Sequence, residues 1–237
     1  MFNINDVNSY PIKFKEFCNK QMDALSNTIN DIKTFHINDG SGLFDILFNM
    51  LKDEDVELIH ASRILDINSI KEYGVLNPNI TPNIVNIILN PIQNKISDEL
   101  FKNVKENLSR EIIKNNKYNK IYFAVGDIKD INLENDFLML NKYGGELLED
   151  IFSLLNFEEL YYDKIAKLGK PYAIFFKEKI SKLYESNKYF VEEIFSFIIL
   201  KYCKNIYAKM FKTSYIYENI EARNILNIFE INMETNY

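Results

Sequence analysis

The chain has 237 residues, of which 47% are hydrophobic and 14% aromatic, and this apolar content is enough for a packed core that folds alone. Its net charge of −6 argues against attraction of nucleic acid to the whole surface, because phosphate binding needs a concentrated basic face; a local basic groove stays open. A length of 237 residues fits one domain, with or without a helical appendage.

Cysteine and histidine usage limits the kinds of site. Cys18 and Cys203 are far apart in sequence and have no CxxC spacing, so neither a disulfide framework nor a thiolate metal site is indicated, and we expect a reducing compartment. The two histidines, His36 and His60, have no partner at metal-ligand spacing, so we expect no metal. His36 lies in a polar, glycine-rich turn and is predicted to be solvated.

Hydropathy predicts a protein that does not enter the membrane. The longest mostly apolar run, residues 194–200, is far shorter than the ~18–20 residues of a membrane span. The N-terminus has no apolar segment of the kind found in signal peptides. We therefore expect a cytoplasmic protein.

In the first half of the chain, apolar spacing predicts mainly helices. The segment from Val56 to His60 suits a short strand, Asp66 or Asn68 suits a helix N-cap, and Gly74 suits the end of that helix. Prolines mark residues 78–91 as irregular. The other predicted helices cover residues 13–32, 43–51 and 97–113.

The second half mixes strands and helices without regular alternation. Strands are predicted at residues 120–125, 171–176, 214–217 and 225–231, and helices at 147–155 and 189–210. No GxGxxG or GxxxxGK[ST] motif follows a predicted strand, so the sequence does not support a Rossmann fold or a P-loop. The pattern predicts an α+β fold, with residues 1–55 as a helical N-terminal segment and residues 56–237 as an α+β domain.

His60 stands out because it ends a strand and precedes Ala61-Ser62-Arg63, which brings an imidazole, a hydroxyl and a guanidinium within a few residues. Taken alone, it suits a half-buried histidine bonded to a backbone carbonyl better than a ligand-binding one. The string HASRILDINSIKEYGVLNP nevertheless resembles the opening signature of ADP-ribosyltransferase-like domains, a strand ending in His-x-[Thr/Ser], then a loop and helix, then a glycine turn. The matching positions are His60, Ser62, Ser69-Ile70 and Gly74.

The resemblance extends to two later elements. Tyr122, in the strand Ile121-Tyr-Phe-Ala, takes the place of the family's aromatic residue that stacks on nicotinamide. Tyr143-Gly-Gly-Glu146 resembles a Tyr-Gly-[Gly/Ser]-Glu element of bacterial proteins that share the histidine signature. The alternatives are an ordinary core strand and, for Glu146, a carboxylate at a helix start. Glu221, or Glu218, is the competing acid, since the closing region of these domains can carry the catalytic glutamate.

The resemblance implies a mostly antiparallel, split central sheet with flanking helices and an enzyme that binds NAD as a substrate. It would cleave the nicotinamide glycosidic bond and transfer ADP-ribose to a protein or nucleic-acid acceptor, in the setting of a toxin, an effector or phage defence. By that resemblance His60 binds a ribose hydroxyl, Tyr122 stacks, Arg63 contacts phosphates and Glu146 stabilises the oxocarbenium-like transition state; Ser62 and Gly74 complete the cofactor-binding set. The alternative is an inactive protein of the same fold that binds a protein or a nucleotide-like ligand.

Overall fold

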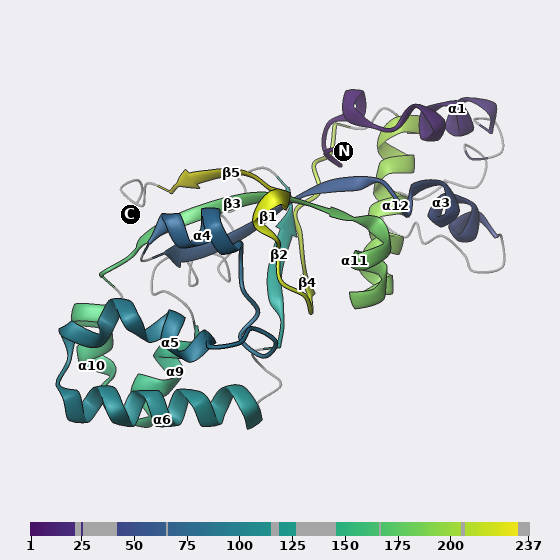
Figure 1. Cartoon of the computed structure of the whole chain (residues 1–237). Coiled ribbons are helices and arrows are strands. Elements are labelled where there is room, and N and C mark those ends of the chain that lie inside the picture. Colours follow the sequence, from purple (N-terminus) through teal and green to yellow (C-terminus); the bar gives the residue numbers. More distant parts are fainter. Residues whose placement is uncertain are drawn as a thin grey trace. The chain divides into compact units, whose positions relative to one another are not determined.

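The protein is an α+β structure, as the sequence pattern predicted, and its five strands form an open antiparallel sheet (Figure 1). The computed structural model describes residues 1–21, 25, 42–64, 66–114, 119–126, 146–165, 167–204 and 207–231, and only the backbone of residues 146 and 147. The strands hydrogen-bond in the order β4-β2-β1-β3-β5. Their bounds are β1 Asp55–Ile64, β2 Ile121–Val125, β3 Lys170–Lys179, β4 Lys212–Ile216 and β5 Ile225–Glu230.

The chain divides into two compact units. The first unit comprises residues 1–59, 122–127 and 177–216, and the second comprises residues 60–121, 128–176 and 217–237. Residues 1–59, which include the N-terminal segment, thus share their unit with later parts of the chain. Both β1 and β3 contribute residues to each unit.

The first unit is built around the apolar helix α12 (Lys188–Lys204). Helices α1 (Ile12–Lys20), α3 (Leu43–Leu51) and α11 (Ile180–Ser186) pack with it. Their buried side chains form its core, including Phe14, Leu47, Leu51, Phe190 and Phe195. The bounds of α3 are those predicted, α12 ends before the predicted residue 210, and the predicted continuation of α1 to residue 32 includes residues outside the described ones.

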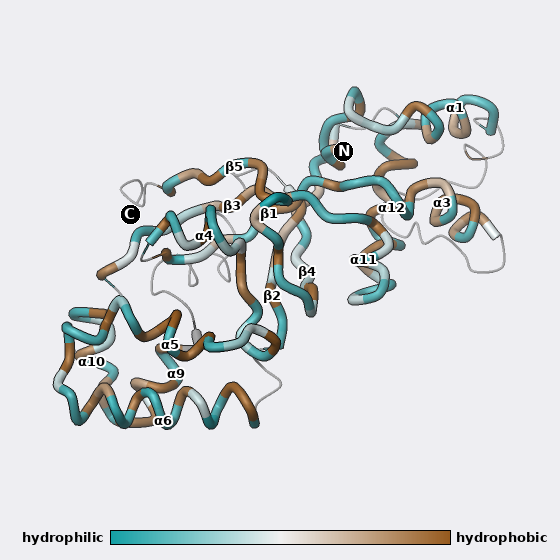
Figure 2. Tube along the Cα trace, in the orientation of Figure 1, coloured by the Kyte–Doolittle hydropathy of each residue, from teal (hydrophilic) through white to brown (hydrophobic). Residues whose placement is uncertain are grey.

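The second unit combines strands with a cluster of helices (Figure 1). Helix α6 (Asp98–Lys114) buries Leu100, Val104, Leu108 and Ile112, the four-residue spacing of one helix face, which Figure 2 shows as alternating brown and teal. The cluster also contains α5 (Ile84–Leu89), the 3₁₀-helix η3 (Asn90–Lys95), α9 (Glu146–Leu154), α10 (Glu158–Leu160) and the π-helical η5 (Tyr161–Ile165). The stretch expected to be irregular, residues 78–91, therefore contains α5 and the start of η3.

Strand β5, in the second unit, forms one edge of the sheet. Strand β5 pairs with β3 in antiparallel register, from Tyr172 opposite Glu230 to Phe176 opposite Ile225, with an irregularity between Phe175 and Phe176. Across the pair, Phe175 and Phe229 meet edge to face at 5.4 Å between ring centroids.

Within the described residues, no helix is long and apolar enough to cross a membrane.

Candidate ligand-binding cavity

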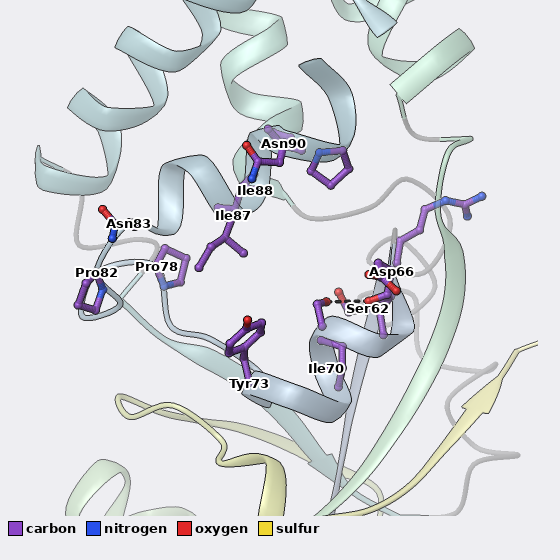
Figure 3. Close-up of a pocket in the computed structure, with 15 residues that line it drawn as sticks. Ser62, Asp66, Ile70, Tyr73, Pro78, Pro82, Asn83, Ile87, Ile88 and Asn90 are labelled. Carbon is purple, nitrogen blue, oxygen red and sulfur yellow. Dashed lines mark hydrogen bonds between the residues drawn. The ribbon is translucent and has the colours of Figure 1, made fainter. Parts of the chain in front are cut away.

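A cavity of about 780 Å³ lies in the second unit, between α4 (Ile67–Tyr73) and α5 (Figure 3). Its walls come from the end of β1, from α4, from the proline-rich stretch that follows and from α9. They are formed by Ser62, Arg63, Ile64, Asp66, Ser69, Ile70, Tyr73, Pro78, Pro82, Asn83, Ile87, Ile88, Asn90, Pro91 and Leu148.

Helix α4 forms one wall and is fixed at both ends by local hydrogen bonds. Asp66 is its N-cap, as predicted, and its Oδ1 accepts a hydrogen bond of 2.9 Å from the backbone N–H of Asn68. Ser69 Oγ donates to the Asp66 carbonyl oxygen at 2.6 Å. The N–H of Gly74 donates to Ile70 O at 2.9 Å and ends the helix. These bonds hold a helix of only seven residues in place.

Gly74 fixes the direction of the chain after α4. Its φ is 82°, in the range that favours glycine, and an added Cβ would lie 1.9 Å from the carbonyl oxygen of Ile220. The next residue, Val75, exchanges two backbone hydrogen bonds of 2.9 Å with Ile220. Gly74 is not among the residues that line the cavity, so its observed role is to let two backbone segments meet.

Asn77 ties the loop after α4 to two other segments. Its fully buried side chain donates to Asn119 O at 2.8 Å and to Tyr217 O at 2.7 Å, while its Oδ1 accepts from the N–H of Asn79. Its own N–H donates to Asn219 Oδ1 at 2.6 Å. The loop that carries Pro78 into the cavity wall is therefore held by side-chain hydrogen bonds rather than by regular secondary structure.

Helix α5 forms the facing wall because its two sides differ. Asn83 precedes it with φ 59°, a left-handed conformation that asparagine tolerates. Ile84 and Leu89 are buried in the helical cluster, and Ile87 lines the cavity. Ile88 lies between the two, because it lines the cavity and also packs against the cluster. In Figure 3, Ile87 and the ring of Tyr73 point toward each other across the space between the two helices. Tyr73 is 51% exposed, so its ring face is available to a ligand.

Arg63 is among the residues that line the cavity. The residue is half-buried, and this loss of hydration lowers the pKa of its guanidinium, against the opposing effect of the buried Tyr161. Arginine nonetheless stays charged in proteins and suits phosphate or carboxylate oxygens. Its stem packs beside Gly169, where an added Cβ would lie 3.3 Å from Arg63 Cγ and 2.8 Å from Ile64 O.

Of the residues matched by the family resemblance, Ser62, Ser69 and Ile70 line the cavity, whereas His60 and Gly74 do not. Arg63, next to Ser62, also lines it. His60 is half-buried in β1, and strand alternation places it on the same face as Ser62. Tyr122 belongs to the first unit, where its 44% exposed ring meets Tyr215 edge to face at 6.2 Å.

The two candidate acids differ in their surroundings. Glu146 is the first residue of α9, and its side chain and the preceding Tyr143-Gly144-Gly145 lie outside the described residues. Leu148, two positions later in the helix, lines the cavity, so helix geometry places the Glu146 backbone within about 6 Å of that of a wall residue. Glu221 forms an ion pair with Arg223 at the start of the 3₁₀-helix η6 (Ala222–Asn224) and is not among the residues that line the cavity.

Sequence reasoning missed the facing wall and the role of Tyr73. Asn83 before Ile-Val-Asn-Ile-Ile-Leu was a usable signal for a short helix, although the neighbouring prolines obscured it. Tyr73 was placed in a helix, but spacing alone does not tell an exposed ring from a core one. In the described part of the chain, no group of three or more His, Cys, Asp or Glu is placed to hold a metal ion.

Comparison of the chain with protein-family models, with curated proteins and with solved structures found no match. The chemistry of the site therefore rests on its own residues. The site suits a ligand with a planar ring at one end and an anionic group at the other. Its lining residues include an exposed aromatic ring, a guanidinium, hydroxyl and amide groups, and apolar side chains of isoleucine, leucine and proline.

Proposed function

We propose that the protein binds NAD in the cavity beside α4, breaks the bond between nicotinamide and ribose, and transfers ADP-ribose to a macromolecular acceptor. The observation that carries the proposal is that the segment resembling the opening signature of ADP-ribosyltransferase-like domains forms a cavity wall. Ser62 and Ser69-Ile70, three of its matched positions, line that cavity, as does Arg63.

The size and chemistry of the cavity support a dinucleotide. Its volume of about 780 Å³ lies within the ~300–1,000 Å³ of most small-molecule sites. Arg63 offers bidentate hydrogen bonds to a phosphate, and Tyr73 offers a ring face for stacking. Ser62 offers a hydroxyl for a ribose or an amide.

The reaction needs a fixed ribose and a nearby negative charge, because breaking the glycosidic bond builds oxocarbenium character on the sugar. In our proposal His60, on the same strand face as Ser62, hydrogen-bonds a ribose hydroxyl. Glu146, the first residue of α9, supplies the charge, which is the role that the resemblance implies for it. The resemblance gave the stacking role to Tyr122; in our proposal Tyr73, which lines the cavity, takes that role.

A second candidate function is nucleotide binding without chemistry. Asp66 is the one carboxylate among the described residues that line the cavity, and its Oδ1 already caps α4. A protein that kept this arrangement without Glu146 in the cavity would bind the ligand and leave its glycosidic bond intact.

The test is to incubate the purified full chain with NAD and to measure nicotinamide release, with NAD binding measured separately by calorimetry. Glu146→Gln keeps the shape of the side chain and removes its charge, and we expect release to fall about 100-fold or more. His60→Ala should also lower release. Glu221→Gln is the matched control and should leave release unchanged.

The outcomes separate the two candidates. Release that depends on Glu146 supports the transferase. NAD binding with release at background supports the binding protein and overturns the transferase. If the chain neither binds NAD nor releases nicotinamide, both candidate functions are overturned. If release is lost in Glu221→Gln but not in Glu146→Gln, the catalytic acid is Glu221.

A further inference from the structure

Cys18 and Cys203, which are far apart in sequence, meet in the first unit. Cys18 lies on α1 and Cys203 near the end of α12, two helices that pack against each other, and the two side chains are close enough for each to shift the pKa of the other. Neither cysteine is in a disulfide; Cys18 is fully buried and Cys203 half-buried. The sequence spacing gave no sign of this pair.

Neighbouring contacts show that helix packing holds the two thiols together. Phe14, one turn before Cys18, meets Tyr202 edge to face at 6.0 Å between ring centroids. The hydroxyl of the same Tyr202 lies 3.2 Å from Oδ1 of Asn19, to which it donates a hydrogen bond. These contacts involve residues beside each cysteine, so α1 and α12 are fixed against each other at the pair.

The surroundings make the two thiols unequal. The neighbouring Cys18 side chain, assisted by the charge of Lys204, lowers the pKa of the Cys203 thiol despite partial burial. Interaction with Cys203, together with burial, raises the pKa of Cys18. The thiolate is the nucleophilic form of cysteine, and Cys203 is also the more exposed of the two, so Cys203 is the attacking thiol.

We propose that Cys18 and Cys203 are a redox-active pair, which forms a reversible intramolecular disulfide when the protein reacts with a peroxide. The Cys203 thiolate attacks one peroxide oxygen, becoming a sulfenic acid while the O–O bond breaks and hydroxide leaves. The Cys18 sulfur then attacks the sulfenic sulfur, and the thiol proton leaves with the hydroxyl group as water. Two thiols and one peroxide thus give one disulfide and two waters, and a dithiol reductant reverses the change. The disulfide ties α1 to α12.

The experiment treats the reduced full chain with hydrogen peroxide, blocks remaining thiols with iodoacetamide, and measures intact mass and unreduced peptides. We expect a loss of about 2 Da and a peptide that joins Cys18 to Cys203, both reversed by dithiothreitol. In 8 M urea the same treatment should form the linked peptide at least about tenfold more slowly, because the fold no longer holds the thiols together.

Variants assign the roles of the two thiols. In Cys18→Ser the sulfenic acid on Cys203 should persist and react with dimedone, whereas in Cys203→Ser the buried Cys18 should resist peroxide. Cys18→Ala serves as a second variant if the serine is not tolerated in its buried site. Oxidation of native wild-type Cys203 to sulfinic acid without the linked peptide would overturn the proposal, as would linkage only between two chains.

Discussion

The α-carbon of Gly74 lies so close to the backbone of Ile220 that a methyl group on residue 74 would sit 1.9 Å from the Ile220 carbonyl oxygen. The same methyl group would be 2.8 Å from the Ala222 nitrogen. Because Gly74 ends α4, this contact sets how the cavity-lining helix is joined to residues 220–222. The glycine matched in the family signature is thus required by packing, whatever the cavity binds.

Gly74→Ala should destabilise the protein by about 3 kcal/mol or more, because the left-handed φ and the backbone clash act together. The free energy of unfolding, measured by urea titration followed by circular dichroism, checks this. Gly42→Ala is the matched control, since Gly42 has φ 66° but no neighbour within 4 Å among the described atoms; it should lose only about 1 kcal/mol. Equal losses would show that the Ile220 contact relaxes without cost.

Asn77→Ala should also destabilise the protein, by about 3 kcal/mol, because it leaves the carbonyls of Asn119 and Tyr217 without their side-chain donor. The same urea titration measures the effect. Asn79→Ala replaces an exposed side chain two residues later and should change the free energy of unfolding by less than about 0.5 kcal/mol. A loss from Asn77→Ala no larger than the control would mean that water replaces both hydrogen bonds.

The sequence predicted the elements whose signals are local. Asp66 caps the start of α4 and Gly74 ends it, and both residues lie within one short segment. The helix and its two ends were therefore predicted correctly. The apolar spacing of α6 likewise set its bounds to within one residue. Propensity and capping act over a few residues, and single-sequence patterns report them well.

Contacts between distant segments were not predictable from such patterns. Nothing near Cys18 indicates that Cys203 will lie beside it, and nothing near Asn77 indicates that Tyr217 will accept its hydrogen bond. Tyr73 and Tyr122 illustrate the same limit for the site, because only the fold shows that Tyr73 lines the cavity. Local spacing fixes the face of an element, but which other element covers that face depends on the whole chain.

Stability should fall above pH 10 partly because of Tyr10. Burial, with a smaller effect of Asp6, raises the pKa of this tyrosine, whose hydroxyl donates to Ile4 O at 2.6 Å. Above pH 10 the unfolded chain loses this proton while the folded chain keeps it, so rising pH favours unfolding. Between pH 9 and 11, wild type should therefore lose about 1 kcal/mol more than Tyr10→Phe.

Urea titrations at pH 9, 10 and 11 measure that difference. Tyr207→Phe is the control, because its hydroxyl is in water in the folded and the unfolded chain; it should follow wild type. The same pH dependence of stability in Tyr10→Phe and wild type would contradict this prediction. It would show that the Tyr10 hydroxyl loses its proton as readily in the folded chain as in the unfolded chain.

If the cavity beside α4 holds NAD, removing the Tyr73 ring should weaken binding. Tyr73→Ala should raise the dissociation constant for NAD about tenfold, because stacking on an aromatic ring contributes about 0.5–1.5 kcal/mol beyond the area it buries. Tyr73→Phe keeps the ring and should bind within about twofold of wild type. Tyr189→Ala removes another exposed tyrosine, one that does not line the cavity, and should bind like wild type. Calorimetric titration of all four proteins with NAD gives the comparison, and unchanged affinity in Tyr73→Ala beside measurable wild-type binding would place the NAD ring away from α4.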